Sequence, residues 1–409
     1  MAGAGLFLGS GGAASAKPHN RHAAPKKDVA KPGDDDDGDS PTGAAVPAGT
    51  SPAETPIGPL DTQARWAFIT DLNTGAVLLQ KAADERMHPS SLTKMMTAYI
   101  VFSMLKEGRL RMDQTLPVSE KAWRMQGSKM FVPLGGQVPV EDLIRGMLIQ
   151  SGNDACIVLA EGIAGSEAQF VVLMNKEAAR LGMTGSQFQN CTGWPDPNHL
   201  MTARDVATIA THLIRDFPQY YHFFSEKDYK FNNIAQGNRN VLVDKGLADG
   251  LKTGHTDAGG FGLCASSERD GRRVVMALNG MPTSKARIQE GERLLAWAFA
   301  NFEDVRLVAA GQSIGEIPVW LGTQPTVPAT AASDVVLTLP HGWQNRVKVT
   351  LDYQSPVAAP VRKSQPVARL LIANGQAAPT EVTLVAAHGV ERKSLPARAL
   401  AVLEHAVSG

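Results

Sequence analysis

The stretch 88–108 constrains the fold of this chain more than any other. It is predicted to form a helix that begins at Ser90, a good N-cap residue, and ends at Gly108, a good C-terminal stop. In its central part, Thr97 and Ser103 are the only polar residues. Because a helix that is apolar on nearly every side must be buried, we expect the domain to fold around it.

A serine and a lysine lie three residues apart at the start of this helix, as Ser91 and Lys94. This spacing puts both side chains on one face of the first turn, within reach of each other. A lysine can take the proton of a serine nucleophile where burial or nearby positive charge favours the neutral amine. The N–H groups of the first turn can also bind a developing oxyanion. Taken alone, the pair also fits a capping serine and a lysine that extends to the surface.

A second polar motif follows a helix predicted over 141–148. Ser151 and Asn153 flank a glycine there, so both side chains can project the same way from a tight turn. Taken alone, this motif also fits an ordinary junction between two helices, with an asparagine or aspartate cap.

A third motif, Lys252-Thr253-Gly254, is predicted to lie on a strand just before two further strands, 260–267 and 272–279. A glycine on such a strand lets the backbone of a ligand lie against it. The lysine and the threonine supply a charge and a hydroxyl to an anionic group.

The order of the predicted elements indicates an α+β fold. The simplest packing is one antiparallel sheet built from both ends of the domain, with the helical part between them in sequence. This packing would bring the three motifs together. The predicted elements are a hairpin of strands 66–70 and 76–80, helices 88–108, 141–148, 157–181 and 202–217, the strands at 250–279, and a helix at 284–302.

Composition divides the chain into four predicted parts. Residues 1–60 are rich in Pro, Ala, Gly and Asp, so we expect a disordered segment, with a possible truncated signal peptide at its start. Residues 61–304 form the predicted catalytic domain, and short strands separated by turns predict a β-rich domain over 305–392. The tail 393–409 is short, and membrane association through it is possible but weakly supported.

Charge and cysteine usage exclude several classes of protein. The 40 basic and 40 acidic residues balance, so neither a nucleic acid nor a membrane surface is indicated as a partner. The three cysteines, Cys156, Cys191 and Cys264, have no metal-type spacing and are expected to be buried free thiols. The ten histidines form no H-E-x-x-H or H-x-H motif, so a metallopeptidase is not indicated.

The three motifs, in this order, match the S-x-x-K, S-x-N and K-T-G set of penicillin-binding proteins and class A β-lactamases. The chain resembles the low-molecular-mass penicillin-binding proteins that act as D-alanyl-D-alanine carboxypeptidases, over about 64–303. The β-rich segment resembles the C-terminal domain of that family more loosely. The resemblance implies a penicillin-binding-protein/β-lactamase-like transpeptidase fold, an antiparallel sheet flanked by helices with a helical subdomain, followed by a small all-β domain.

The resemblance also implies catalytic roles. Ser91 would attack the D-Ala–D-Ala peptide carbonyl with Lys94 as its base. Ser151 and Asn153 would relay protons and hold the substrate amide. Lys252 would supply a positive field that helps to keep Lys94 neutral.

Substrate-binding roles are implied for a second group of residues. Thr253 would bind the terminal carboxylate, with Gly254 beside it on the same strand. The backbone N–H groups of Ser91 and His255 would form the oxyanion hole, whereas the His255 side chain also fits a structural role. Arg287 matches a family arginine near the carboxylate, although it also fits a surface helix arginine.

The function implied is that of a serine carboxypeptidase that is periplasmic or extracytoplasmic, either unattached or peripheral on the inner membrane. It would trim the terminal D-alanine from peptidoglycan stem pentapeptides without metal or organic cofactor. A class A β-lactamase needs a deacylating glutamate downstream of the middle motif, and 178–225 contains none. β-Lactams are therefore expected to be covalent inhibitors. The alternatives are an endopeptidase that cuts D-alanyl cross-links and a non-catalytic cell-wall scaffold.

Overall fold

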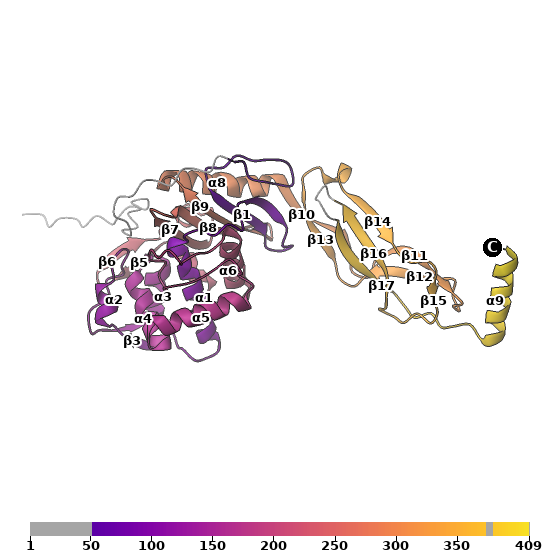
Figure 1. Ribbon diagram of the computed structural model, residues 1–409, viewed down its shortest axis with the longest axis horizontal. Coiled ribbons are helices and arrows are strands. Elements are labelled where there is room, and N and C mark those ends of the chain that lie inside the picture. Colours follow the sequence, from indigo (N-terminus) through magenta and orange to yellow (C-terminus); the bar gives the residue numbers. More distant parts are fainter. Residues whose placement is uncertain (1–50, 374–378, 409) are drawn as a thin grey trace, which may run out of the picture.

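The computed structural model describes residues 51–373 and 379–408 (Figure 1). Its centre is a five-stranded antiparallel sheet with the order β2-β1-β9-β8-β7. The strands come from both ends of the large domain, as the sequence predicts: β1 (Trp66–Asp71), β2 (Val77–Lys81), β7 (Gly250–Thr256), β8 (Gly260–Arg269) and β9 (Arg272–Met281).

Helices cover both faces of this sheet (Figure 1). Helix α8 (Ser284–Asn301) packs on one face, and its core includes Leu263, Met276 and Leu294. The opposite face meets the helical part, which surrounds the buried helix α1 (Lys94–Lys106). The other long helices there are α3 (Val140–Leu148), α4 (Asn153–Ala164), α5 (Glu167–Arg180) and α6 (Ala203–Asp216).

Short elements complete the large domain. Two small hairpins lie beside the helical part, formed by β3 (Thr115–Pro117) with β4 (Gln137–Pro139) and by β5 (Asp228–Phe231) with β6 (Ile234–Gly237). The remaining short helices are η1 (Ser90–Thr93), α2 (Glu120–Arg124), η2 (Tyr221–Phe224) and α7 (Val241–Asp244).

The start of the central helix differs from the prediction. Ser90 is not an N-cap: its φ is 53°, and its hydroxyl lies 3.1 Å from the Thr256 hydroxyl instead of bonding a helix N–H. A 3₁₀ turn, η1, precedes α1, because this turn packs directly against β7. The predicted end is confirmed, since Gly108 has a φ of 70° just after α1.

Two other predicted segments also differ. Residues 51–60, predicted to be disordered, lie against the sheet, where Glu54 pairs with Gln80 and Ala53 is fully buried. The small residues of this polar segment are buried against the edge of the sheet, and this packing orders the segment. The helix predicted over 157–181 is two helices, α4 and α5, which are separated at Gly165 with a φ of 78°.

Residues from 302 onward form an elongated β-rich part (Figure 1). A six-stranded sheet has the order β14-β16-β17-β12-β11-β15, and β10 pairs with β13. The strands are β10 (Phe302–Val308), β11 (Ser313–Trp320), β12 (Thr326–Ala331), β13 (Val335–Pro340), β14 (Lys348–Asp352), β15 (Val357–Ala358), β16 (Pro366–Ala373) and β17 (Thr380–Ala386). The turn η3 (Trp343–Asn345) lies before β14, and helix α9 (Leu395–Ser408) lies at the far end in Figure 1.

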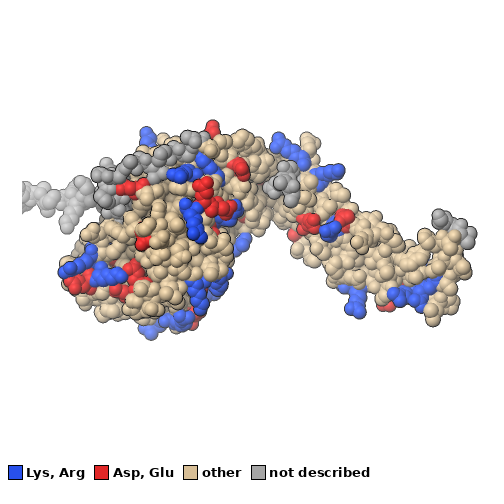
Figure 2. Space-filling model, viewed as in Figure 1, with Lys and Arg blue, Asp and Glu red and all other residues tan. Residues whose placement is uncertain are grey.

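Surface and core agree with the composition in two respects. Acidic and basic side chains are interspersed over the face seen in Figure 2. All three cysteines are buried free thiols, as predicted, and burial raises the pKa of the Cys156 thiol to about 12. Within the described residues, no single helix is both long enough and apolar enough to cross a membrane. Helices α4 and α5 meet these two criteria only when they are taken together, across a bend of 85°.

Candidate active site

The lysine at the start of α1 lies at the centre of a buried polar cluster. Lys94 is fully buried, and its Nζ donates to the Ser91 Oγ at 2.7 Å. It also donates to the Asn153 Oδ1 at 2.6 Å and to the Thr192 carbonyl oxygen at 2.8 Å. The structure therefore brings the predicted nucleophile, the predicted base and one member of the second motif together.

The two polar side chains of the second motif each face a buried lysine. Ser151 has a left-handed φ of 61°, and its Oγ accepts from the Lys252 Nζ at 2.9 Å. Asn153 is the first residue of α4, and its Nδ2 donates to the Gln126 carbonyl at 2.9 Å. This leaves the Asn153 Oδ1 directed at Lys94. The tight turn thus links the lysines of the first and third motifs.

The third motif lies on the edge strand β7, which packs against the turn that carries Ser91. A Cβ added at Gly254 would lie 3.0 Å from the backbone nitrogen of Ser91, a tighter contact than Cβ atoms usually make, so glycine favours this close approach. Thr253 is buried, and its hydroxyl has no hydrogen-bond partner among the described residues. A buried hydroxyl without a partner is costly, which makes this group a ready donor or acceptor for a ligand.

An aromatic ring connects the remaining two predicted residues. The His255 ring stacks on Phe261, with the ring centroids 3.9 Å apart. The Arg287 guanidinium lies 5.6 Å from the centroid of the same ring, and its NH2 group is 3.4 Å from the Ser284 hydroxyl. Arg287 is only 1% exposed, so its reading as a surface arginine is wrong. The stacking of His255 supports the structural role for its side chain.

Sequence reasoning missed the loop that supplies the third partner of Lys94. The Thr192 carbonyl has no residue-type signal, because every residue carries a backbone carbonyl. His199, in the same loop, is buried. Its Nδ1 accepts from the Gln189 N–H at 3.1 Å, and its Nε2 lies 2.8 Å from the Thr93 hydroxyl. Burial lowers the pKa of His199 to about 4. At neutral pH this histidine is therefore a fixed neutral hydrogen-bonding group.

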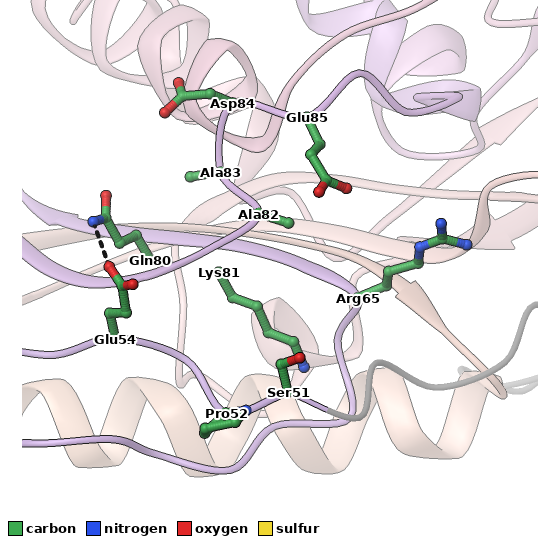
Figure 3. Close-up of a pocket in the computed structure, with 10 residues that line it drawn as sticks. All are labelled: Ser51, Pro52, Glu54, Arg65, Gln80, Lys81, Ala82, Ala83, Asp84 and Glu85. Atoms are coloured by element: carbon green, nitrogen blue, oxygen red, sulfur yellow. Dashed lines mark hydrogen bonds between the residues drawn. The ribbon is translucent and has the colours of Figure 1, made fainter.

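A larger cavity lies elsewhere. It has a volume of about 770 Å³, and residues from 51–54 and from 80–85 line it together with Arg65 (Figure 3). Lys81 in its wall donates to the Thr62 carbonyl at 3.1 Å. A smaller cavity of about 260 Å³ lies beside the site, because Ser90 and Thr256 line it with the loop 193–197. Within the described parts of the chain, no group of three or more His, Cys, Asp or Glu side chains is placed to hold a metal ion.

Comparison with known proteins gives matches over most of the chain. Residues 51–283 match the family described as D-alanyl-D-alanine carboxypeptidase, and residues 302–392 match the family described as penicillin-binding protein 5, C-terminal domain. The D-alanyl-D-alanine carboxypeptidase DacA of Haemophilus influenzae is 39% identical over 322 residues, which are 77% of this chain and 82% of that protein. The protein of the same name from Escherichia coli strain K12 is 39% identical over 307 residues, 73% of this chain and 76% of that protein. The crystal structure of penicillin binding protein 5 from Haemophilus influenzae has a TM-score of 0.72 and 38% identity, covering 82% of this chain and 99% of that one.

Proposed function

Because this chain belongs to the D-alanyl-D-alanine carboxypeptidase family, we propose that it removes the terminal D-alanine from peptidoglycan stem pentapeptides through an acyl-enzyme on Ser91. The family resemblance and the fold class predicted from the motifs are both confirmed by these matches. The observation that carries the catalytic proposal is the 2.7 Å contact between the Lys94 Nζ and the Ser91 Oγ inside a fully buried cluster.

Acylation begins with the neutral amine of Lys94. Such an amine has two N–H groups, which the Asn153 Oδ1 and the Thr192 carbonyl accept, and one lone pair, which then faces the Ser91 hydroxyl. The lone pair takes the hydroxyl proton while the oxygen bonds to the carbonyl carbon of the penultimate D-alanine. Lys252 borders this group, because its Nζ donates to the Ser151 Oγ at 2.9 Å.

Departure of D-alanine and hydrolysis return the proton. The C–N bond breaks, and the leaving amine takes the proton from Lys94 by way of the Ser151 hydroxyl. A water molecule then gives a proton to Lys94 and attacks the ester carbonyl. The bond from carbon to the Ser91 Oγ breaks, and that oxygen recovers its proton from Lys94. The backbone N–H groups of Ser91 and His255 would bind the oxyanion of both tetrahedral intermediates.

Recognition of the substrate carboxylate is assigned to the third motif and α8. The partnerless hydroxyl of Thr253 supports a hydrogen bond to this group. The buried guanidinium of Arg287 adds a positive charge that a buried anion requires. β-Lactams carry a carboxylate and a strained amide, so they would acylate Ser91 in the same orientation and act as covalent inhibitors.

The location of the substrate supports a position outside the cytoplasm, for which we propose the periplasm. Helix α9 supports contact with the membrane surface, because Leu395, Leu400 and Leu403 expose 75%, 58% and 64% of their surface. Flotation with anionic lipid vesicles of the full chain and of a chain that ends at 393 tests this contact. Equal flotation of the two proteins would exclude a role for α9.

Two experiments test the reaction. A fluorescent penicillin should label the wild type and the Ser90→Ala control but not Ser91→Ala, and label on Ser91→Ala would refute the nucleophile. Mass spectrometry of a pentapeptide that ends in D-Ala-D-Ala should show loss of one D-alanine. If only cross-linked dimers are cleaved, the endopeptidase alternative holds, and if neither labelling nor turnover occurs, the scaffold alternative holds.

A further inference from the structure

The loop 189–199 contacts η1 and the first residue of α1 at three points. The Thr192 carbonyl accepts from Lys94, and His199 contacts Thr93. Between them, the backbone of Gly193 packs against the turn: a Cβ there would lie 1.8 Å from the Ser90 carbonyl oxygen. The position of this loop is therefore coupled to the position of the nucleophile and its base.

One side chain inside the loop holds its backbone together. The Asn190 Oδ1 accepts from the backbone N–H groups of Thr192, Gly193 and Trp194 at 3.2, 2.7 and 3.0 Å, and from the Thr192 hydroxyl at 3.1 Å. The Asn190 Nδ2 donates to the Trp194 carbonyl at 2.9 Å. Half-buried Asn190 thus satisfies most of the polar groups of this tight turn.

The contact with Gly193 determines the direction of the carbonyl that Lys94 uses. The Thr192 carbonyl and the Gly193 N–H belong to one peptide unit, and in a trans peptide these two groups point in opposite directions. Because Asn190 holds the N–H at 2.7 Å, the carbonyl is directed away from Asn190 and towards Lys94, which it meets at 2.8 Å.

We propose that Asn190 is a positioning residue for the reaction, which aims the Thr192 carbonyl at Lys94 and so orients the general base towards Ser91. The inference rests on the proposed function, because it assigns the role through Lys94. If the Thr192 carbonyl turned away, the neutral amine would lose one of its two acceptors and its lone pair would no longer be fixed. The chemical step would slow, while the groups that bind the substrate carboxylate would remain in place.

Two variants and a matched control test this role. Asn190→Ala should lower the rate of acylation by a fluorescent penicillin by about 10- to 100-fold, with KM for a D-Ala-D-Ala pentapeptide changed by less than about threefold. Asn190→Asp keeps the acceptor for the three N–H groups, so it should retain most of the acylation rate.

The control is Asn175, which is also half-buried and bonds the neighbouring loop at the Phe188 N–H and carbonyl, at 2.9 Å each. Asn175→Ala should lower the melting temperature but leave the acylation rate and its pH profile unchanged. The proposal is overturned if Asn190→Ala is folded and acylates at the wild-type rate, or if a folded Asn190→Asp loses about 10- to 100-fold of the acylation rate although it keeps the acceptor. The second outcome decides the matter even where Asn190→Ala does not fold. Failure of the proposed function would look different, because then the wild type itself would not be labelled.

Discussion

The buried polar residues of the site differ in whether other groups of the protein form hydrogen bonds with them. Lys94 has three hydrogen-bond acceptors, and Ser151 has a lysine donor. The hydroxyl of Thr253 has no hydrogen-bond partner within the described chain. Residues of the first kind hold the catalytic geometry, whereas the second kind is available to a substrate, so their substitutions should have different consequences.

Thr253→Val should weaken catalysis without weakening the fold. A hydrogen bond to a charged group contributes about 1.5–3 kcal/mol, so kcat/KM for a pentapeptide should fall by about 10- to 100-fold. The melting temperature should not fall, because the lost hydroxyl is buried without a partner. The control is a peptide with an amidated C-terminus, whose turnover should be insensitive to the substitution. Equal losses with both peptides would remove the role of Thr253 in carboxylate binding.

His199 should make the stability of the protein dependent on pH. Its pKa is about 4 in the folded protein, against an ordinary value of 6.5 for an unfolded chain. Above pH 6.5 the ring is neutral in both states and its contribution is complete. As the pH falls from 6.5 to 4, only the unfolded chain gains the proton, so the free energy of unfolding should fall by about 3 kcal/mol.

Urea titrations across this pH range provide the measurement. His199→Gln should flatten the slope of stability against pH between 4 and 6.5, whereas substitution of the exposed His222 by glutamine should leave the slope unchanged. An unchanged slope in His199→Gln would show that other groups cause the dependence.

At the level of elements, the site depends on how closely β7 approaches η1. Gly254→Ala would place a Cβ 3.0 Å from both the Ser91 nitrogen and the Ser90 Cβ, so the strand and η1 must separate by a few tenths of an ångström. A displacement of this kind should reduce acylation by about 10-fold. Gly237→Ala on β6 is the matched control, since its Cβ would meet only the Lys227 carbonyl oxygen, at 3.9 Å. Comparable acylation rates for the two variants would contradict this account.

Elements with a strong apolar pattern could be predicted from the sequence, and those that depend on tertiary packing could not. The hairpins β1–β2 and β8–β9 carry clear turn residues, including Asp270-Gly271 with φ values of 52° and 77°, and α1 carries a nearly unbroken apolar run. Strand β12 has little signal in the sequence, because its buried residues include Ala329 and Ala331, which have little strand preference, and because it contains Pro328. It becomes a strand through its neighbours β11 and β17.

The same division applies to the site. Ser91 and Lys252 carry reactive side chains within recognisable motifs, so the sequence alone could predict that they lie in one site. The Thr192 carbonyl and the left-handed Ser90 could not, because a backbone group or a backbone angle becomes functional only through long-range packing. Asn190 is five-fold bonded within its own loop, yet an asparagine in a loop is too common a pattern to indicate a role.

In the whole molecule, a buried arginine joins the central sheet to the β-rich part. The Arg272 Nε donates to the Asp71 Oδ2 at 2.8 Å, and its NH1 donates to the carbonyls of Ala298 and Phe302 at 3.1 and 2.7 Å. Phe302 is the first residue of β10, so this side chain spans the junction between the two parts. The neighbouring turn adds a hydrogen bond from the Asn73 Nδ2 to the Asp304 Oδ2 at 3.1 Å.

Arg272→Met should therefore destabilise the junction strongly. Asp71 is fully buried, and removal of its charged partner leaves a buried carboxylate with only neutral donors from Asn73 and Thr74, which costs about 3–5 kcal/mol. Arg306→Met is the control, because its ion pair with Asp334 is exposed and should contribute less than about 1 kcal/mol. In urea titrations, we expect Arg272→Met either to unfold with a lower midpoint or to unfold in two separate transitions, one for each part of the molecule. Acylation of Ser91 under native conditions should persist, since none of these contacts involves a residue of the site.

The double variant Asp71→Asn with Arg272→Met should recover part of the lost stability, because it removes the unpaired charge. No recovery would mean that the two carbonyl contacts of Arg272 dominate.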